Sequence, residues 1–218
     1  MMEFMLLVPV WVPLILGTMW IGSALIRGQQ VMQMARDLAS MYSRRVDFSS
    51  NGGNTSSAML SRITQQVGSV TPSGTGAVVF TTLLYVGNSV CASLNGTNGS
   101  MVYGVAPSAG SAGSHTGNCT NWGNFVFTQQ YSQGNTALLS SKFGTAPTNK
   151  MDSNFNISAS DYVTNAAYKA TFNLLPAPQE LGKDGYQSGQ SIYLVETFFK
   201  GAGQPGYAQG GNYAYAIF

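Results

Sequence analysis

The hydrophobic and polar positions divide this chain into two unequal parts. Residues 4–26 are almost all apolar, and only Thr18, Ser23, two prolines and two glycines interrupt the run. About 20 apolar residues suffice for a helix that crosses a bilayer. The rest of the chain is rich in Gly, Ser, Asn and Gln, with short apolar runs between turn residues. The pattern predicts the α+β class, in which a long N-terminal hydrophobic helix precedes an antiparallel β-rich globular head.

The helical pattern continues beyond the apolar run. Apolar residues recur there at spacings of three and four, which is typical of an amphipathic helix; they are Val31, Met34, Ala35, Leu38, Met41 and Tyr42. A helix from Glu3 to about Arg45 would be roughly 65 Å long, about twice the length that a membrane anchor needs. Because Pro9 and Pro13 lack an amide proton, we expect a kink or an unwound stretch between Met5 and Pro13.

The chain is expected to form three consecutive regions. They are an assembly or transmembrane helix at 1–48, a Ser/Asn/Gly-rich linker at 49–57 and an extracellular β-rich head at 58–218. Within the head, residues 58–67 fit a short helix.

The head contains seven runs that resemble β-strands. They lie at 77–86, 90–94, 101–106, 124–131, 167–175, 191–200 and 212–218. The region 159–175 also fits a helix, because Ser160 and Asp161 could cap one. We expect these strands to form an antiparallel sheet that packs partly on the upper half of the long helix.

Charged residues are few and unevenly placed. They make up 8% of the chain, about a third of the usual fraction. No Asp, Glu, Lys or Arg occurs between residues 63 and 141. Nucleic-acid binding needs clustered Lys and Arg, so we expect no nucleic-acid partner. A nearly uncharged surface lacks the repulsion that keeps monomers apart, which suits a subunit that packs against copies of itself.

The residues that usually carry chemistry are scarce. Cys91 and Cys119 are the only cysteines, and in an exported domain such a pair most often forms one disulfide. Two free thiols in a cytosolic protein are the alternative. His115 is the only histidine and lies in a Gly/Ser-rich loop, so neither a catalytic triad nor a zinc site is predicted. We expect no enzyme activity, no metal and no cofactor.

Two further patterns have more than one interpretation. Aromatic residues near the C-terminus form either an adhesive or inter-subunit patch or, as we favour, an edge or final strand that closes the head; they are Tyr207, Tyr213, Tyr215 and Phe218. Asn-x-Ser/Thr triplets arise by chance in so Asn-rich a chain, and surface glycosylation is the alternative; they begin at Asn54, Asn95, Asn98, Asn118 and Asn156.

The N-terminal residues also occur in a characteristic spacing. Glu3-Phe4 is followed by Pro9 and Gly17, and then by a Gln/Ala/Arg-rich stretch at 29–39. This arrangement resembles the N-terminal signature of the TadE/TadG-like pilins of tight-adherence (Tad) systems, which are relatives of type IV pili. Residues 193–199 are similar to a strand that is common in such proteins.

The resemblance implies a membrane-inserted precursor. A prepilin peptidase cuts such precursors, and the pilus assembly machinery moves them from the inner membrane into a helical filament on the cell surface. In type IV pilins the signature carboxylate pairs with the N-terminal amine of a neighbouring subunit, and here that role falls to Glu3. The family carboxylate is usually the fifth residue of the mature chain, whereas Glu3 is the third, which leaves the start of the mature chain open. The residues expected to serve assembly are Glu3, Phe4, Pro9, Pro13, Gly17 and Gly22.

The leading hypothesis is a structural subunit of an extracellular type IV-like filament that polymerises through its N-terminal helix. A minor pilin or pseudopilin and a monomeric membrane-anchored binding protein are the alternatives. One pattern opposes the leading hypothesis. The arginines that follow the apolar run would hold that side in the cytoplasm by the positive-inside rule; they are Arg27, Arg36, Arg44 and Arg45. A removed basic leader would reconcile this pattern with an external head.

Overall fold

The fold is known from a computed structural model of the chain. The described backbone covers residues 2–49, 53–87, 120–157, 162, 164–171, 189–201 and 210–218. Side chains are described from residue 8 in the first of these segments and from residue 58 in the second. The side chains of Glu3 and Phe4 and the residues Cys91, Cys119 and His115 therefore lie outside the described part, as do the strands expected at 90–94 and 101–106.

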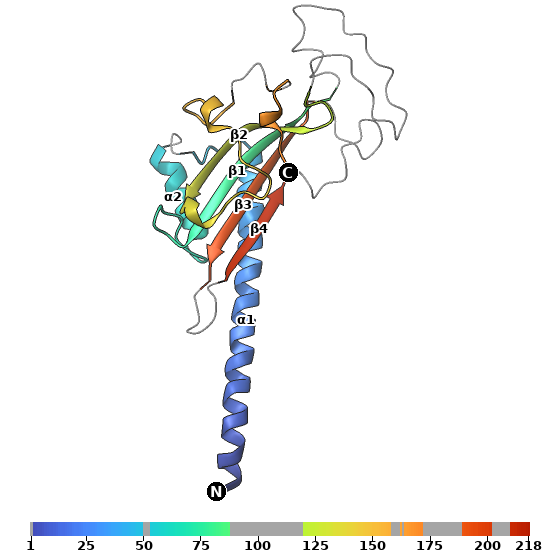
Figure 1. Cartoon of the computed structure of the whole chain (residues 1–218). Coiled ribbons are helices and arrows are strands. Elements are labelled where there is room, and N and C mark those ends of the chain that lie inside the picture. Colours follow the sequence, from blue (N-terminus) through green and yellow to red (C-terminus); the bar gives the residue numbers. More distant parts are fainter. Residues whose placement is uncertain are drawn as a thin grey trace, which may run out of the picture.

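Helix α1 (Met2–Ser43) forms a long rod that carries the head at its C-terminal end (Figure 1). Its 42 residues correspond to a length of about 63 Å. The helix continues without interruption through Pro9 and Pro13, so the kink or unwound stretch expected between Met5 and Pro13 is wrong. The two prolines are four residues apart and lie on the same side of the helix, so the backbone hydrogen bonds of the other residues hold the turns together.

The C-terminal end of α1 is closed by a Schellman motif. The amide of Arg45 donates to the Tyr42 carbonyl (2.9 Å), and the amide of Val46 donates to the Met41 carbonyl (3.2 Å). Arg45 has a left-handed backbone with φ of 65°, at a position that glycine usually occupies. The motif reverses the chain, so that it returns across the sheet with the buried Phe48.

Four antiparallel strands form one sheet in the order β2-β1-β3-β4. They are β1 (Gly76–Tyr85), β2 (Phe125–Gly134), β3 (Ser191–Lys200) and β4 (Gly211–Ile217). Each was predicted from the sequence to within a few residues. Tyr213 and Tyr215 thus lie in the last strand of the sheet, as favoured above, and Phe218 follows it directly, whereas Tyr207 lies outside the described residues.

The strand and helix boundaries differ from the prediction in two other places. Helix α2 (Gly53–Thr64) begins within the expected linker, five residues before the predicted helix at Ala58. The described part of the ambiguous region, residues 164–171, contains a short 3-10 turn (Ala166–Tyr168) and a single bridge from Lys169 to Val126. Residues 164–171 form a single bridge with β2 and no strand, and residues 172–175 of the expected strand lie outside the described part.

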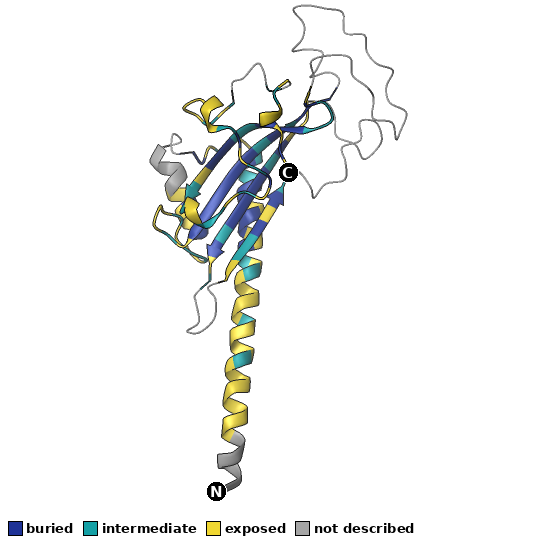
Figure 2. Cartoon of the chain, in the orientation of Figure 1, coloured by how far each residue is buried: buried dark blue, intermediate teal, exposed yellow. Residues whose placement is uncertain are grey.

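One face of the sheet packs against the second half of α1 and against α2 (Figure 2). Alternation along the strands places Val78 and Phe80 of β1 on this face, where Tyr42 meets the Phe80 ring edge-on at 5.3 Å. All the predicted apolar positions from Val31 to Tyr42 are buried except Met41, which is partly buried. The predicted packing of the sheet on the upper half of α1 is therefore confirmed.

The opposite face is covered by the segment that follows β2. Glu196 of β3 lies completely buried there. Its carboxylate accepts hydrogen bonds from the Lys142 amide (2.9 Å), the Tyr213 hydroxyl (2.7 Å) and the Ser141 hydroxyl. These bonds attach the covering segment to β3 and β4, because a buried carboxylate needs every donor that it can reach.

Candidate functional site: the exposed apolar stalk

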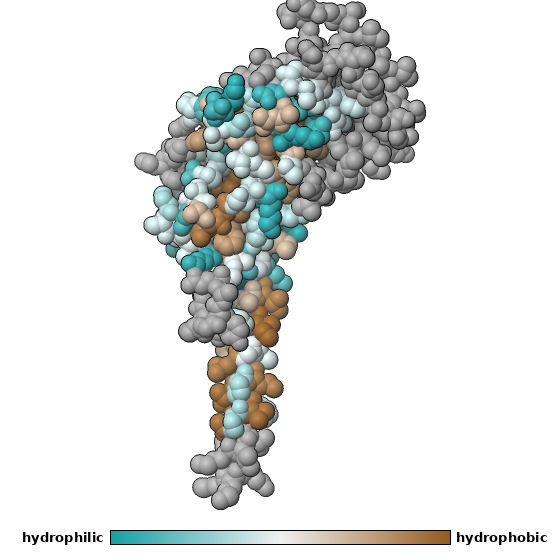
Figure 3. Space-filling view, viewed as in Figure 1, coloured by the Kyte–Doolittle hydropathy of each residue, from teal (hydrophilic) through white to brown (hydrophobic). Residues whose placement is uncertain are grey.

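The N-terminal half of α1 projects from the head without any cover. We call residues 8–26 the stalk. Figure 3 shows mostly hydrophobic surface along this part of the molecule. Its large apolar side chains are between 42% and 69% exposed; they are Val8, Val10, Trp11, Val12, Leu14, Ile15, Leu16, Met19, Trp20, Ile21, Leu25 and Ile26. So large an apolar surface on a protein marks an interaction with another protein or with lipid.

The stalk is apolar on all of its sides. Successive helical residues are rotated by about 100°, so the consecutive Leu14, Ile15 and Leu16 already point in three different directions. A helix that packs against a single partner has one apolar stripe, whereas an all-round apolar helix is surrounded by apolar material. The stalk therefore requires cover on every side.

The two hydroxyl side chains of the stalk are compatible with such surroundings. The Thr18 hydroxyl donates to the Ile15 carbonyl (2.9 Å), and the Ser23 hydroxyl donates to the Trp20 carbonyl (2.8 Å). Because each hydroxyl finds its acceptor within the helix, neither needs water. These bonds were not anticipated from the sequence, although both residues were recognised as interruptions of the apolar run.

The length of the stalk matches the apolar thickness of a membrane. Residues 8–26 span about 28 Å as a helix, compared with a hydrocarbon layer of about 30 Å. The exposed Arg27 follows directly, and Val31 is already part of the head core. By length and composition, α1 is the one helix among the described residues that could cross a membrane, and it lies near the N-terminus. Whatever covers the stalk thus ends at the base of the head.

The expected assembly residues lie along this stalk and its N-terminal extension. Pro9 and Pro13 are within the helix. A Cβ atom added at Gly17 or Gly22 would meet no atom within 4 Å, so these positions offer open surface to a neighbour. Glu3 is in the first turns of α1, beyond the described side chains, and its predicted pairing stays a prediction.

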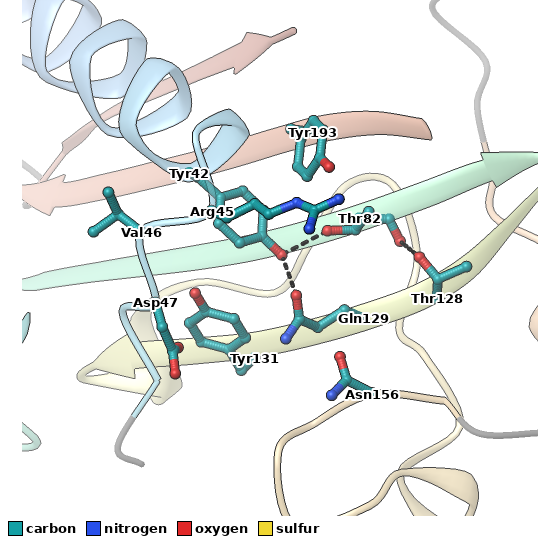
Figure 4. A pocket seen from close by; sticks show the side chains of 10 residues that line it. All are labelled: Tyr42, Arg45, Val46, Asp47, Thr82, Thr128, Gln129, Tyr131, Asn156 and Tyr193. Atoms are coloured by element: carbon teal, nitrogen blue, oxygen red, sulfur yellow. Dashed lines mark hydrogen bonds between the residues drawn. The ribbon is translucent and has the colours of Figure 1, made fainter. Parts of the chain in front are cut away.

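A second feature lies in the head, where α1 ends above the sheet. A cavity of about 320 Å³ opens there between the end of α1, three strands and the loop after Asp152 (Figure 4). The Tyr42 hydroxyl shares a hydrogen bond with the Thr82 hydroxyl (2.7 Å) and donates to the Gln129 side-chain carbonyl (2.9 Å). The sequence pattern predicted Tyr42 only as an apolar position. The cavity residues come from distant segments and carry no shared motif.

Burial changes the acidity of Tyr131, a second tyrosine that lines the cavity. Tyr131 lies 4% exposed, and its hydroxyl accepts a hydrogen bond from the Phe48 amide (3.3 Å). Burial, followed by the nearby Tyr42 hydroxyl, raises the pKa of Tyr131 above its ordinary value. The ring therefore remains neutral at physiological pH and acts in packing and hydrogen bonding.

Within the described part of the chain, no group of three or more His, Cys, Asp or Glu side chains is placed to hold a metal ion. The two distinctive features are thus the stalk and the head cavity. Comparison with known proteins adds no assignment, because no protein-family model, curated protein or solved structure matches the chain.

Proposed function

We propose that this chain is a structural subunit of an extracellular type IV-like filament and that it polymerises by packing its stalk against the stalks of sister subunits. Before assembly the same stalk lies in the membrane. The observation that carries the proposal is a stalk that is apolar on all sides and continuous with a helix packed in the head core. The N-terminal resemblance to TadE/TadG-like pilins supports the same function.

The free energy available from covering the stalk is large. Full burial of a large apolar side chain contributes about 1.5–3 kcal/mol. Twelve such side chains of the stalk keep roughly half of their surface exposed, so covering them contributes on the order of 10 kcal/mol. Lipid and sister helices both provide this cover, so a subunit can pass from one to the other without exposing the stalk to water.

The continuity of α1 makes this association directional. Residues 31–42 of the same helix are fixed in the head core, and only four residues separate Ile26 from Val31. When stalks pack side by side, their heads are therefore held at the same end and form the outer layer. A sparsely charged head surface tolerates such close packing.

The direct test is to shear filaments from cells that express the full chain. Electron microscopy and mass spectrometry of the sheared fraction should show helical filaments in which this chain is the abundant component. A trace amount in filaments of another protein would identify a minor subunit. Recovery only from the membrane, without filaments, would refute the proposal and indicate an anchored monomer.

Glu3→Ala tests the predicted pairing at the N-terminus. If Glu3 pairs with a neighbouring amine, the variant should produce far fewer filaments while its level in the membrane is unchanged. Asp37→Ala is a matched control, because Asp37 is exposed on α1 at the level of the head and its loss removes the same charge. Equal filament number and length in the two variants would contradict the pairing role.

Gly22→Leu tests close packing of the stalks. A Cβ atom at Gly22 would meet nothing within 4 Å, and leucine is favourable in lipid, so we expect folding and membrane insertion to be unaffected. Packed stalks lack room for the added side chain, so filament yield should fall, with Gly22→Ala giving a smaller effect. An unchanged yield for Gly22→Leu would exclude close packing at this position.

A further inference from the structure

The cavity at the end of α1 has the size and composition of a small-molecule site. Its volume of about 320 Å³ is at the lower end of the usual range for ligand pockets, about 300–1,000 Å³. Its walls combine tyrosine rings with polar side chains from α1, the sheet and the loop that contains Asn156 (Figure 4). Such a mixture of aromatic surface and a few polar groups is typical of binding sites.

Several polar groups at the cavity are not used by the fold. Among the described residues, the guanidinium of Arg45, the carboxamide of Asn156 and the hydroxyl of Tyr193 have no hydrogen-bond partner. All three residues line the cavity. They supply both donors and acceptors. In contrast, Tyr42 and Gln129 are already bonded to each other and form the back of the site.

The charges of the lining indicate an uncharged ligand. Arg45 and Asp47 are the only charged side chains among the described residues that line the cavity, and their charges balance. One Asp47 oxygen accepts a hydrogen bond from the Ser49 amide (2.8 Å), and the other has no partner among the described residues. An anion would be repelled by Asp47 and a cation by Arg45, whereas hydroxyl groups can bond to both.

The backbone at Arg45 gives a second reason to assign a role to its side chain. Arg45 occupies the left-handed position of the Schellman motif, where glycine is the preferred residue. An arginine there is conformationally unfavourable, and residues in such conformations cluster at ligand sites. The guanidinium it brings to the cavity is a planar group with several donors.

We propose that this cavity binds one uncharged pyranose sugar, with Arg45 and Asn156 bonding its hydroxyl groups and the partly exposed Tyr193 ring contacting its apolar face. Planar guanidinium and carboxamide groups can each bond two adjacent hydroxyls. The Tyr193 ring contacts the C–H groups of the sugar. The site is independent of the proposed filament, because Tyr42 lies about 24 Å along α1 from Ile26 and so remains outside the covered stalk.

The test uses the full chain in a detergent without a sugar headgroup. Saturation-transfer NMR is recorded with the methyl glycosides of glucose, galactose and N-acetylglucosamine, and with glucuronate and inorganic phosphate as anionic probes. Saturable binding of at least one neutral glycoside, with weaker binding of the anionic probes, is expected. No binding of any neutral glycoside, or binding of the anions alone, would overturn the proposal.

Two variants locate the site. Arg45→Gly and Asn156→Ala should each weaken sugar binding by about tenfold, the effect of losing one strong hydrogen bond. Arg44→Ala is the matched control, because it removes the neighbouring positive charge outside the cavity lining, and it should bind as the unchanged chain does. Because glycine suits the backbone at Arg45, the midpoint of urea unfolding should not fall in Arg45→Gly. Normal sugar binding by a folded Arg45→Gly variant would refute the assignment.

Discussion

Glu196 provides a quantitative test of how the head is held together. Its buried carboxylate accepts bonds from three donors, which belong to Ser141, Lys142 and Tyr213. Glu196→Leu preserves most of the side-chain volume but leaves all three donors without this acceptor. A buried donor without a partner costs about 1–3 kcal/mol, and the Ser141 and Tyr213 hydroxyls can turn partly to other acceptors or water. We therefore expect Glu196→Leu to lower the free energy of unfolding by about 3–5 kcal/mol.

Glu196→Gln separates the charge of this side chain from its hydrogen bonds. The glutamine carbonyl can occupy the place of the oxygen that receives the Lys142 amide and the Tyr213 hydroxyl. Its amide group can then donate to the Ser141 oxygen. The bonds remain but are no longer assisted by charge, so we expect a loss of about 1–2 kcal/mol.

Both variants can be measured by urea unfolding of the full chain in detergent, followed by near-UV circular dichroism of the head tyrosines. The midpoint should fall in the order unchanged chain, Glu196→Gln, Glu196→Leu, with similar slopes. A Glu196→Leu variant as stable as the unchanged chain would refute the role assigned to this carboxylate. So would a Glu196→Gln variant that is less stable than Glu196→Leu.

Two further predictions concern the opposite face of the sheet. Leu38 is completely buried between α1 and the sheet, so Leu38→Ala should lower the free energy of unfolding by about 3–5 kcal/mol. Met32 is 48% exposed, so the control Met32→Ala should change this free energy by less than about 0.5 kcal/mol. Equal urea midpoints for the two variants would contradict the packing of α1 on the sheet. The pKa of Tyr131 is raised in the folded state, so its contribution to stability is complete below the unfolded value of about 10 and is lost as the pH rises through the higher folded pKa. The urea midpoint should therefore decrease above about pH 10, and a decrease of the same size in Tyr131→Phe would contradict this origin.

Sequence patterns predicted the parts of the fold that depend on local periodicity. The apolar run defines the stalk, and spacings of three and four identified the buried face of α1 from Val31 to Tyr42. The four strands of the sheet were found because short apolar runs lie between turn residues. In each case the signal lies within one stretch of chain, because helix and strand place side chains on their faces with a fixed period.

Predictions from local sequence were less reliable where hydrogen bonds in neighbouring turns, or packing against other segments, oppose the local preference of a residue. Pro9 and Pro13 predicted a break in α1, but the remaining hydrogen bonds on both sides maintain the helix. Gly53 belongs to α2, although its sequence surroundings are typical of a linker. Helix boundaries are set partly by what the helix packs against, and the core position of Leu60 provides that packing.

The sequence alone determined that a long apolar helix precedes a β-rich head, because hydrophobic patterning acts within each element. Only the tertiary structure decided the strand order β2-β1-β3-β4, the burial of Glu196 and the cavity beside Arg45. Tyr42 and Gln129 are 87 residues apart in the chain, and Glu196 and Lys142 are 54 apart. Contacts of this kind depend on which faces of the helices and strands meet when the whole chain folds, and a local pattern in the sequence does not determine which faces meet.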